Sequence, residues 1–193
     1  MRLSYHVMSS PLGLLFLARS EAGLKALRFM DRKSIKRMIA THDKIWPGAE
    51  WTPSLLELKP IVDQLEAYFC GALAAFDYPL DPDGTEFQRL VWKALLDIPF
   101  GEKRTYGQVA RAIRQPRAAR AVGLANNQNP IAIVIPCHRV VGANGALSGY
   151  GGGVKRKRWL LEHEVRFAGM TGGDGDLFTA AAADRSAGRR TPR

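Results

Sequence analysis

The feature that most constrains the fold is a run of five apolar residues, Ile131 to Ile135, that leads directly into Pro136, Cys137 and His138. An apolar run that delivers a thiol and an imidazole into a loop is one way to build a reactive cysteine. The thiolate is the reactive form, and a neighbouring histidine favours it. Most free cysteines and most histidines near apolar segments are nevertheless packed core groups. The Cys-His pair alone is therefore weak evidence of catalysis.

The basic charge of the chain lies in its second half. The 193 residues carry a formal net charge of +10. Residues 1–84 hold ten Lys and Arg against ten Asp and Glu, whereas residues 85–164 hold thirteen against five. A basic half joined to a neutral half indicates a polyanionic partner on one face, most simply nucleic acid. A solvated basic surface that only aids solubility is the alternative.

Cysteine usage argues against a disulfide framework. Cys70 and Cys137 are the two cysteines, and with four scattered histidines they do not indicate a structural metal site. This usage fits a reducing cytosol or nucleus. Cys70 stands near a predicted helix end, and we interpret it as core filler.

Residues 1–53 have the pattern of short strands with turns. The apolar stretch Leu12–Ala18 is predicted to be a strand rather than a signal peptide, because the turn at 21–23 and a second apolar run, Leu24–Phe29, complete a hairpin. No stretch approaches the length of a transmembrane helix, so we expect no membrane partner.

A helix is predicted after these strands. Ser54 and Glu57 match a capping box that would begin it. Apolar residues then recur at helical spacing, at Leu58, Val62, Leu65 and Phe69. Pro60 should kink the helix or delay its start, and Gly71 should end it. Residues 78–84, rich in Pro and Asp, are predicted to be an interdomain linker.

Two short helices are predicted within the basic half. Thr105 and Gln108 form a capping box that begins the first, and Pro116 breaks it. Residues 117–126 form the second, and the pair fits a helix-turn-helix. The second helix carries small side chains, which let its backbone approach another surface closely. Tight helix packing within the core is the alternative.

These elements predict an α+β chain with two domains. Residues 1–84 would form a small N-terminal α/β domain with a short antiparallel sheet. Residues 85–165 would form a mostly α-helical helix-turn-helix domain that carries the active site, opening with a capping box at Thr85 and Gln88. Residues 166–193, rich in Gly, Ala, Asp and Arg, are predicted to be a disordered tail.

Several separated motifs, in order, resemble those of a known family. They are Asn129-Pro130, Pro136-Cys137-His138-Arg139-Val140, Gly149-Tyr150-Gly151-Gly152 and Trp159-Leu160-Leu161-Glu162-His163-Glu164. With family spacing from about Thr85 to Glu164, the chain resembles the methylated-DNA–protein-cysteine methyltransferases, or O6-alkylguanine-DNA alkyltransferases. Residues 1–84 resemble the N-terminal domain of that family more loosely.

The resemblance implies a DNA repair protein that flips alkylated guanine out of duplex DNA. It would transfer the alkyl group irreversibly to its own Cys137 in a single turnover, with alkylated thymine left open as a second substrate. His138 and Glu164 would complete a Cys–water–His–Glu relay, in which Glu164 orients the imidazole and stabilises its charged form. Side chains of sequence neighbours generally point apart, so a water molecule between sulfur and imidazole is geometrically reasonable. Asn129 matches a hinge asparagine that braces the active-site turn.

The resemblance also assigns DNA and substrate contacts. Tyr106 matches the tyrosine that protonates the departing guanine and crowds the backbone phosphate. Arg120 matches the arginine that fills the gap left by the flipped base, which offsets part of the extrusion cost. The other assigned positions are Ala121 and Gly123 for DNA binding and Tyr150, Gly151 and Gly152 for a substrate lid.

Two departures from the family pattern are visible. Gly151 stands where the family usually has Ser or Ala, which preserves a backbone N–H contact but removes a hydroxyl contact. The zinc ligands of some eukaryotic members are not evident, so we expect no metal and no cofactor. The resemblance further implies a monomer that binds double-stranded DNA through the minor groove, in the cytoplasm with the nucleoid, or in the nucleus of a eukaryote.

Two other classes of protein compete with this interpretation. An alkyltransferase-like damage sensor would bind lesions without chemistry, but such proteins lack the acceptor cysteine that Cys137 supplies. A Cys-His hydrolase such as a cysteine protease would need direct contact between Cys137 and His138 and an oxyanion hole. It would not need a basic helix-turn-helix.

Overall fold

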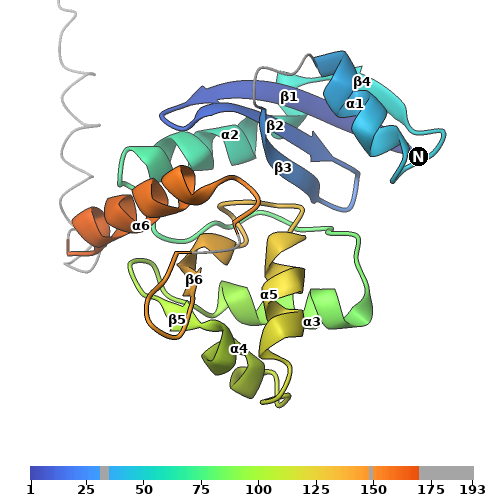
Figure 1. The fold of residues 1–193 in the computed structure, drawn as a ribbon. Helices are drawn as coiled ribbons and strands as arrows, with labels where there is room; N and C mark the ends of the chain where they lie inside the picture. The colour runs from blue at the N-terminus through green and yellow to red at the C-terminus, as the bar shows by residue number, and fades with distance from the viewer. Residues whose placement is uncertain (31–34, 148–149, 170–193) are drawn as a thin grey trace, which may run out of the picture.

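A four-stranded sheet forms the N-terminal half of the protein (Figure 1). The computed structural model describes residues 1–30, 35–147 and 150–169. Three strands form an antiparallel meander: β1 (Arg2–Ser10), β2 (Gly13–Arg19) and β3 (Leu24–Met30). The predicted hairpin is thus β2 and β3. β4 (Glu50–Pro53) pairs with β1 in parallel, so the sheet is mixed rather than purely antiparallel, with the order β3-β2-β1-β4.

Alternation along β2 separates two apolar clusters. Leu15 and Leu17 face one side of the sheet, because alternate side chains of a strand point to opposite faces. They join the main core with helix α2 (Leu55–Phe69) and the C-terminal helices. Phe16 and Ala18 face the other side and pack with Met38 of α1 (Ile35–Asp43). The prediction of only strands and turns over residues 1–53 was wrong for α1. The buried residues of α1 are Met38 and His42, so the helix lacks the regular spacing of apolar residues by which a helix is predicted.

Helix α2 (Leu55–Phe69) begins as the sequence predicts. The Ser54 side chain accepts a hydrogen bond from the Glu57 N–H. Pro60 does not delay the start, because the helix continues through it. Gly71, with φ +76°, follows the helix end as expected, and a side chain there would overlap the Phe167 ring. Cys70 is exposed, so the interpretation as core filler was wrong.

The C-terminal half is mainly helical, so the predicted α+β class is confirmed. Both predicted capping boxes are reciprocal, at α3 (Glu86–Leu96) and at α4 (Tyr106–Ala112). The predicted second short helix is α5 (Ala119–Asn127), which packs against α3 and α4. A two-stranded parallel sheet, β5 (Arg104–Thr105) and β6 (Val140–Val141), lies beside them.

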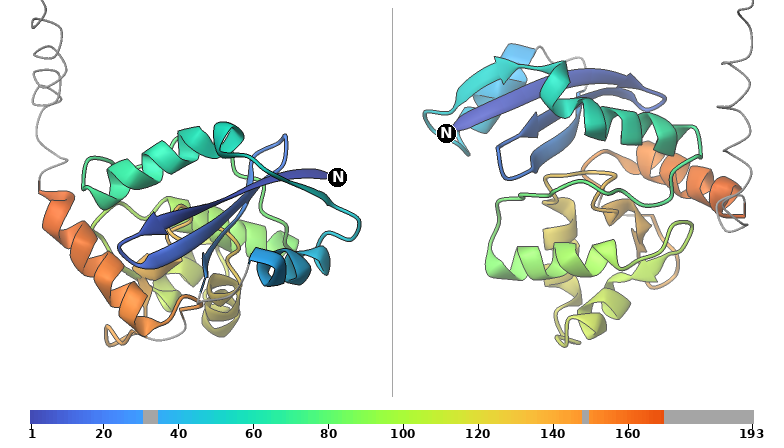
Figure 2. Two further views of the ribbon diagram at one scale, coloured as in Figure 1. Left: turned by 90° about the horizontal axis from the view of Figure 1, so that it is seen from above. Right: turned by 180° about the vertical axis from the view of Figure 1, so that it is seen from behind.

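The last helix, α6 (Val154–Ala168), returns to the N-terminal half. Figure 2 shows α2 and α6 side by side, and His163 on α6 hydrogen-bonds to the Tyr68 carbonyl at 2.8 Å. The helix continues past residue 165, where the domain was predicted to end. Residues 170–193 of the predicted tail lie outside the described residues.

The two halves also meet at the edge of the sheet. Leu27 on β3 forms a parallel bridge with Ile131, with hydrogen bonds of 3.0 Å from Leu27 N to the Pro130 carbonyl and from Ala132 N to the Leu27 carbonyl. The apolar run 131–135 that precedes Cys137 is therefore paired with the N-terminal sheet. Among the described residues, no helix is long and apolar enough to cross a membrane.

Candidate active site

The apolar run ends in a turn that Asn129 holds from within. The Asn129 amide donates hydrogen bonds to the carbonyls of Ile131, at 3.3 Å, and Ile135, at 2.9 Å, while its Oδ1 accepts one from Ile131 N. Ile133 within this turn has φ +72°, a conformation that β-branched residues rarely adopt. Such strain persists only where surrounding contacts enforce it, and the Asn129 bonds are of that kind.

Cys137 begins a single 3-10 turn, η1 (Cys137–Arg139), and its side chain is buried. The Asn129 amide lies 3.0 Å from Sγ and donates to it. Asn126 on α5 donates a second bond, at 3.2 Å, to the Cys137 carbonyl. Two asparagine side chains therefore fix the thiol and its backbone.

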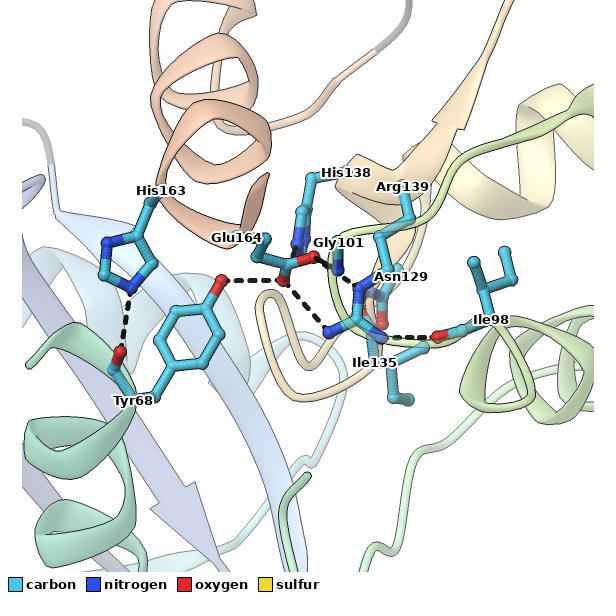
Figure 3. Close-up of polar contacts among 9 residues, drawn as sticks. All are labelled: Tyr68, Ile98, Gly101, Asn129, Ile135, His138, Arg139, His163 and Glu164. Atoms are coloured by element: carbon cyan, nitrogen blue, oxygen red, sulfur yellow. Dashed lines mark hydrogen bonds and ion pairs between the residues drawn. The ribbon is translucent and has the colours of Figure 1, made fainter. Parts of the chain in front are cut away.

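His138 and Glu164 form a fully buried pair (Figure 3). The distance between His138 Nε2 and Glu164 Oε1 is 2.8 Å. His138 Nδ1 is buried and has no hydrogen-bond partner among the described residues. With Nε2–H donating to the carboxylate, Nδ1 carries the lone pair and can accept a proton.

The Glu164 carboxylate accepts from several donors besides His138. Arg139 donates from Nε at 2.8 Å and from NH2 at 3.0 Å, the Tyr68 hydroxyl donates at 2.9 Å, and Gly101 N donates at 3.1 Å. Figure 3 shows these bonds converging on the carboxylate from separate segments. A carboxylate with this many partners stays ionised and cannot rotate freely.

Burial and pairing act in opposite directions on these groups. Burial alone would raise the pKa of Glu164, but hydrogen bonds and charge from His138 and Arg139 outweigh it and hold that pKa far below its usual value. Burial lowers the pKa of His138 despite its bond to Glu164, so the resting imidazole is neutral. Burial raises the pKa of Cys137, which the Asn129 hydrogen bond and the Lys157 and Arg28 charges oppose.

A cavity of about 320 Å³ opens at Cys137. Its C-terminal wall contains Asn126, Asn129, Ala132, Tyr150, Gly151 and Gly152. The N-terminal half supplies the opposite wall, with Arg28 and Phe29 from β3 and Met38, Thr41 and His42 from α1. The cavity is thus built by both halves of the chain.

Contacts with the N-terminal half hold the predicted lid. Arg156 donates to the Leu12 carbonyl and to the Gly152 carbonyl, both at 3.1 Å, and its guanidinium lies 4.5 Å from the centroid of the Phe29 ring. A Cβ at Gly152 would come within 2.6 Å of Tyr150 and 2.7 Å of Phe29, so no side chain fits there. These contacts fix the backbone of residues 150–152 at the wall of the cavity.

Three of the predicted DNA-contact residues line a second hollow, which shares no lining residue with the cavity at Cys137. A shallow groove between α4 and α5 is lined by Tyr106, Arg120 and Gly123, and Arg120 and Ala121 are exposed. Gly123 faces the Tyr106 ring, which lies 3.8 Å from where a Cβ would stand. The structure therefore brings Cys137, the predicted relay residues and the predicted lid together, whereas Tyr106, Arg120 and Gly123 line this groove instead.

Several residues of the site escaped sequence reasoning. Arg139 directly follows His138, and a buried arginine beside a reactive pair could have indicated a carboxylate partner. Tyr68, Arg28 and Asn126 gave no comparable signal, because only the fold brings them to the site. Among the described residues, no cluster of three His, Cys, Asp or Glu side chains could hold a metal ion.

Comparisons with known proteins cover nearly all of the described chain. Residues 3–82 match the family described as 6-O-methylguanine DNA methyltransferase, ribonuclease-like domain, and residues 86–166 match the DNA binding domain of the same name. The chain is 49% identical over 160 residues to the methylated-DNA–protein-cysteine methyltransferase of Methanosarcina acetivorans, covering 83% of this chain and 97% of the relative. It is 51% identical over 162 residues to that of Mycobacterium tuberculosis, covering 84% and 92%.

Solved structures agree with these matches. The crystal structure of the Mycobacterium tuberculosis O6-methylguanine methyltransferase is similar with a TM-score of 0.76 and 47% identity, covering 92% of this chain and 99% of that chain. The Mycobacterium tuberculosis OGT in complex with DNA has a TM-score of 0.73 and 48% identity, covering 86% and 94%.

Proposed function

The chain belongs to the 6-O-methylguanine DNA methyltransferase family, which repairs alkylated DNA by transfer of the alkyl group to a cysteine of the protein, and we propose that Cys137 is that cysteine. The observation that carries this proposal is the buried His138–Glu164 pair beside a buried thiol that lines a cavity. Cys70, the other cysteine, is exposed and lies outside that cavity.

The proposed reaction needs a base, a nucleophile and an acid. His138 Nδ1 takes the thiol proton through a water molecule, and Glu164 stabilises the imidazolium that forms. The Cys137 sulfur then attacks the alkyl carbon, the bond from that carbon to O6 breaks, and its electron pair stays with the base. A proton from Tyr106 neutralises the departing guanine, a role that the resemblance assigns. Asn129 keeps the sulfur on the cavity side of the turn.

A single turnover per chain follows from the chemistry. The product is a thioether, which has no good leaving group to regenerate the thiol. Cys70 is not among the residues that line the Cys137 cavity, so it is not placed to accept the group. Each chain therefore repairs one lesion.

We assign DNA recognition to the groove between α4 and α5. Small side chains at Ala121 and Gly123 let α5 approach the minor groove, and exposed Arg120 fills the stack that the flipped nucleotide leaves. The lid of Tyr150, Gly151 and Gly152 then holds the base over Cys137. The substrates are alkylated guanine and, as a second candidate, alkylated thymine.

The remaining assignments follow the family resemblance. We propose that residues 1–84 and 85–165 are the two domains, with 166–193 as a tail. The protein would act as a monomer on double-stranded DNA, in the cytoplasm with the nucleoid, or in the nucleus of a eukaryote.

Incubation with a duplex that carries a labelled alkyl group tests the proposal. We expect one equivalent of label, found on the peptide that contains Cys137, and no label on Cys137→Ser. Label on Cys70, or product beyond one equivalent, would overturn the assignment. A damage sensor would gain no label, and a cysteine protease would cleave peptides in a parallel incubation without DNA.

A further inference from the structure

Arg28 reaches the acceptor cavity from the N-terminal half. It stands on edge strand β3, next to Leu27, which pairs with the active-site segment. Its side chain is half-buried and lines the same cavity as Cys137. A cation from one half of the chain therefore faces the thiol of the other.

No partner in the described part of the chain explains the burial of Arg28. Among the described residues it forms no hydrogen bond or ion pair, whereas Arg139 binds Glu164, Arg156 binds two carbonyls and Arg19 lies 3.6 Å from Glu57. Removing an unpaired cation from water is costly unless another charge offsets it. A negative charge that forms in the cavity would therefore stabilise Arg28.

The Cys137 thiol lines the cavity and becomes such a negative charge when it loses its proton. Burial lowers the pKa of Arg28, and Cys137 is the charge that opposes this effect. The Glu164 carboxylate is occupied by His138, Arg139, Tyr68 and Gly101.

The other titratable and charged groups near Cys137 come from its own turn, α6, α1 and the segment of Tyr150. His138 and Arg139 share its turn, Lys157 and Arg156 come from α6, and His42 comes from α1. Tyr150 lines the cavity, and burial raises its pKa, so its hydroxyl stays neutral. Burial lowers the pKa of His42, so it is neutral near pH 7. Lys157 already donates to the Val140 carbonyl, and burial lowers its pKa too. Arg28 stays charged throughout the physiological range, because a guanidinium is not deprotonated in proteins.

We propose that Arg28 is a positioning residue through which the N-terminal domain stabilises the thiolate of Cys137 electrostatically. The inference rests on the proposed role of Cys137 as alkyl acceptor. Arg28 exchanges no proton and forms no bond in the reaction. It raises the fraction of the protein that holds the sulfur as thiolate at neutral pH, while the proton leaves through His138.

The test is the pH dependence of alkyl transfer from free O6-benzylguanine, which requires no DNA. The second-order rate constant is measured between about pH 6 and pH 9 for the full chain and for Arg28→Gln. We expect the midpoint of the profile to move to higher pH in Arg28→Gln. The rate should fall about fivefold at pH 7 and approach the original value above the midpoint. Arg28→Lys should restore the midpoint, because it returns a cation.

Arg19→Gln is the matched control, since Arg19 is also half-buried in the sheet but faces Glu57. Its profile should coincide with that of the unmodified chain. An unchanged midpoint in Arg28→Gln, or an equal loss at every pH, would refute the proposal. If Arg28→Gln does not fold, Arg28→Met keeps the length of the stem and takes its place. Peptide mass analysis of the unmodified chain separates the two proposals: benzyl on a residue other than Cys137 refutes the acceptor assignment, whereas benzyl on Cys137 with an unchanged midpoint refutes only the role of Arg28.

Discussion

The Tyr68 hydroxyl donates a hydrogen bond of 2.9 Å to Oε1 of Glu164, a residue 96 positions later in the chain. Tyr68 is the penultimate residue of α2, in the N-terminal half, and its side chain is fully buried. The neighbouring His163 binds the Tyr68 carbonyl. The carboxylate that orients His138 is therefore held from both halves of the protein.

Replacing Tyr68 by Phe should weaken this support without abolishing it. The variant removes one donor, while Arg139, His138 and Gly101 still satisfy the carboxylate. We expect a loss of about 1–2 kcal/mol in unfolding free energy, measured by urea denaturation. Alkyl transfer should slow by at most about 30-fold, the factor in rate that corresponds to about 2 kcal/mol. A loss of activity as large as that of Glu164→Gln would mean that Tyr68 has a direct chemical role.

Glu164→Gln should affect the chemistry strongly. The amide cannot stabilise an imidazolium as a carboxylate does, so alkyl transfer should slow by about 100-fold. DNA affinity should stay unchanged, because α4 and α5 do not contain Glu164. The thiolate of Cys137, followed by its ultraviolet absorbance, should form at higher pH than in the unmodified chain. A thiolate titration identical to that of the unmodified chain would contradict the relay.

Stability should fall in acid because of the same carboxylate. The pKa of Glu164 is held far below its unfolded value of about 4.3, so between the two values the unfolded chain binds more protons than the folded one. Stability from this group is fully present above about pH 5 and is lost as the pH falls below that value. Thermal melting from about pH 7 to pH 3 should show the decline, and Glu164→Gln should show a shallower one. Parallel declines for the two proteins would count against this account.

Local signals in the sequence predicted most of the helices and the residues of the cysteine turn. The capping boxes at Thr85 and Thr105 formed as expected, since their hydrogen bonds involve residues three positions apart. Helix α1 was missed, because its burial depends on packing against Phe16 rather than on a strong apolar periodicity of its own. Cys70 was wrongly predicted to be buried, because a position near the end of a helix does not determine whether the side chain faces the core or the solvent.

The contributions of the N-terminal half to the site could not be predicted from the sequence. Tyr68 and Arg28 reach Glu164 and Cys137 only after the sheet and α2 have docked on the C-terminal half. No spacing rule connects residues so far apart. The relay pair itself was accessible only through resemblance, since His138 and Glu164 are also distant in sequence.

Arg120→Ala should separate extrusion from chemistry. Repair of a lesion in a duplex requires an unstacking cost of a few kcal/mol, whereas free O6-benzylguanine requires none. We expect the duplex reaction to slow by about tenfold or more and the free-base reaction to change little. The two rates are measured side by side on one preparation. Equal losses on both substrates would refute the role of Arg120 in filling the stack.

Binding to undamaged DNA should depend strongly on salt. The excess of basic residues lies in 85–164, and neutralising phosphates releases condensed counterions. The logarithm of the association constant should fall linearly with the logarithm of salt concentration, as measured by fluorescence anisotropy. Arg120→Ala should make that slope shallower if Arg120 meets a phosphate, and leave it unchanged if it only stacks. Affinity independent of salt would show that the basic half is merely a solvated surface.

The bridge between Leu27 and Ile131 bears on how the protein melts. Edge strands usually expose unpaired backbone groups, but here the active-site segment takes up two of those on β3. The Glu164 carboxylate and the main apolar core are also shared, so unfolding of one half would remove contacts that hold the other. Heating should therefore produce one cooperative transition rather than two, with calorimetric and van't Hoff enthalpies that agree. The proposed boundary near residue 84 would then divide the sequence without dividing the protein into separate thermodynamic units.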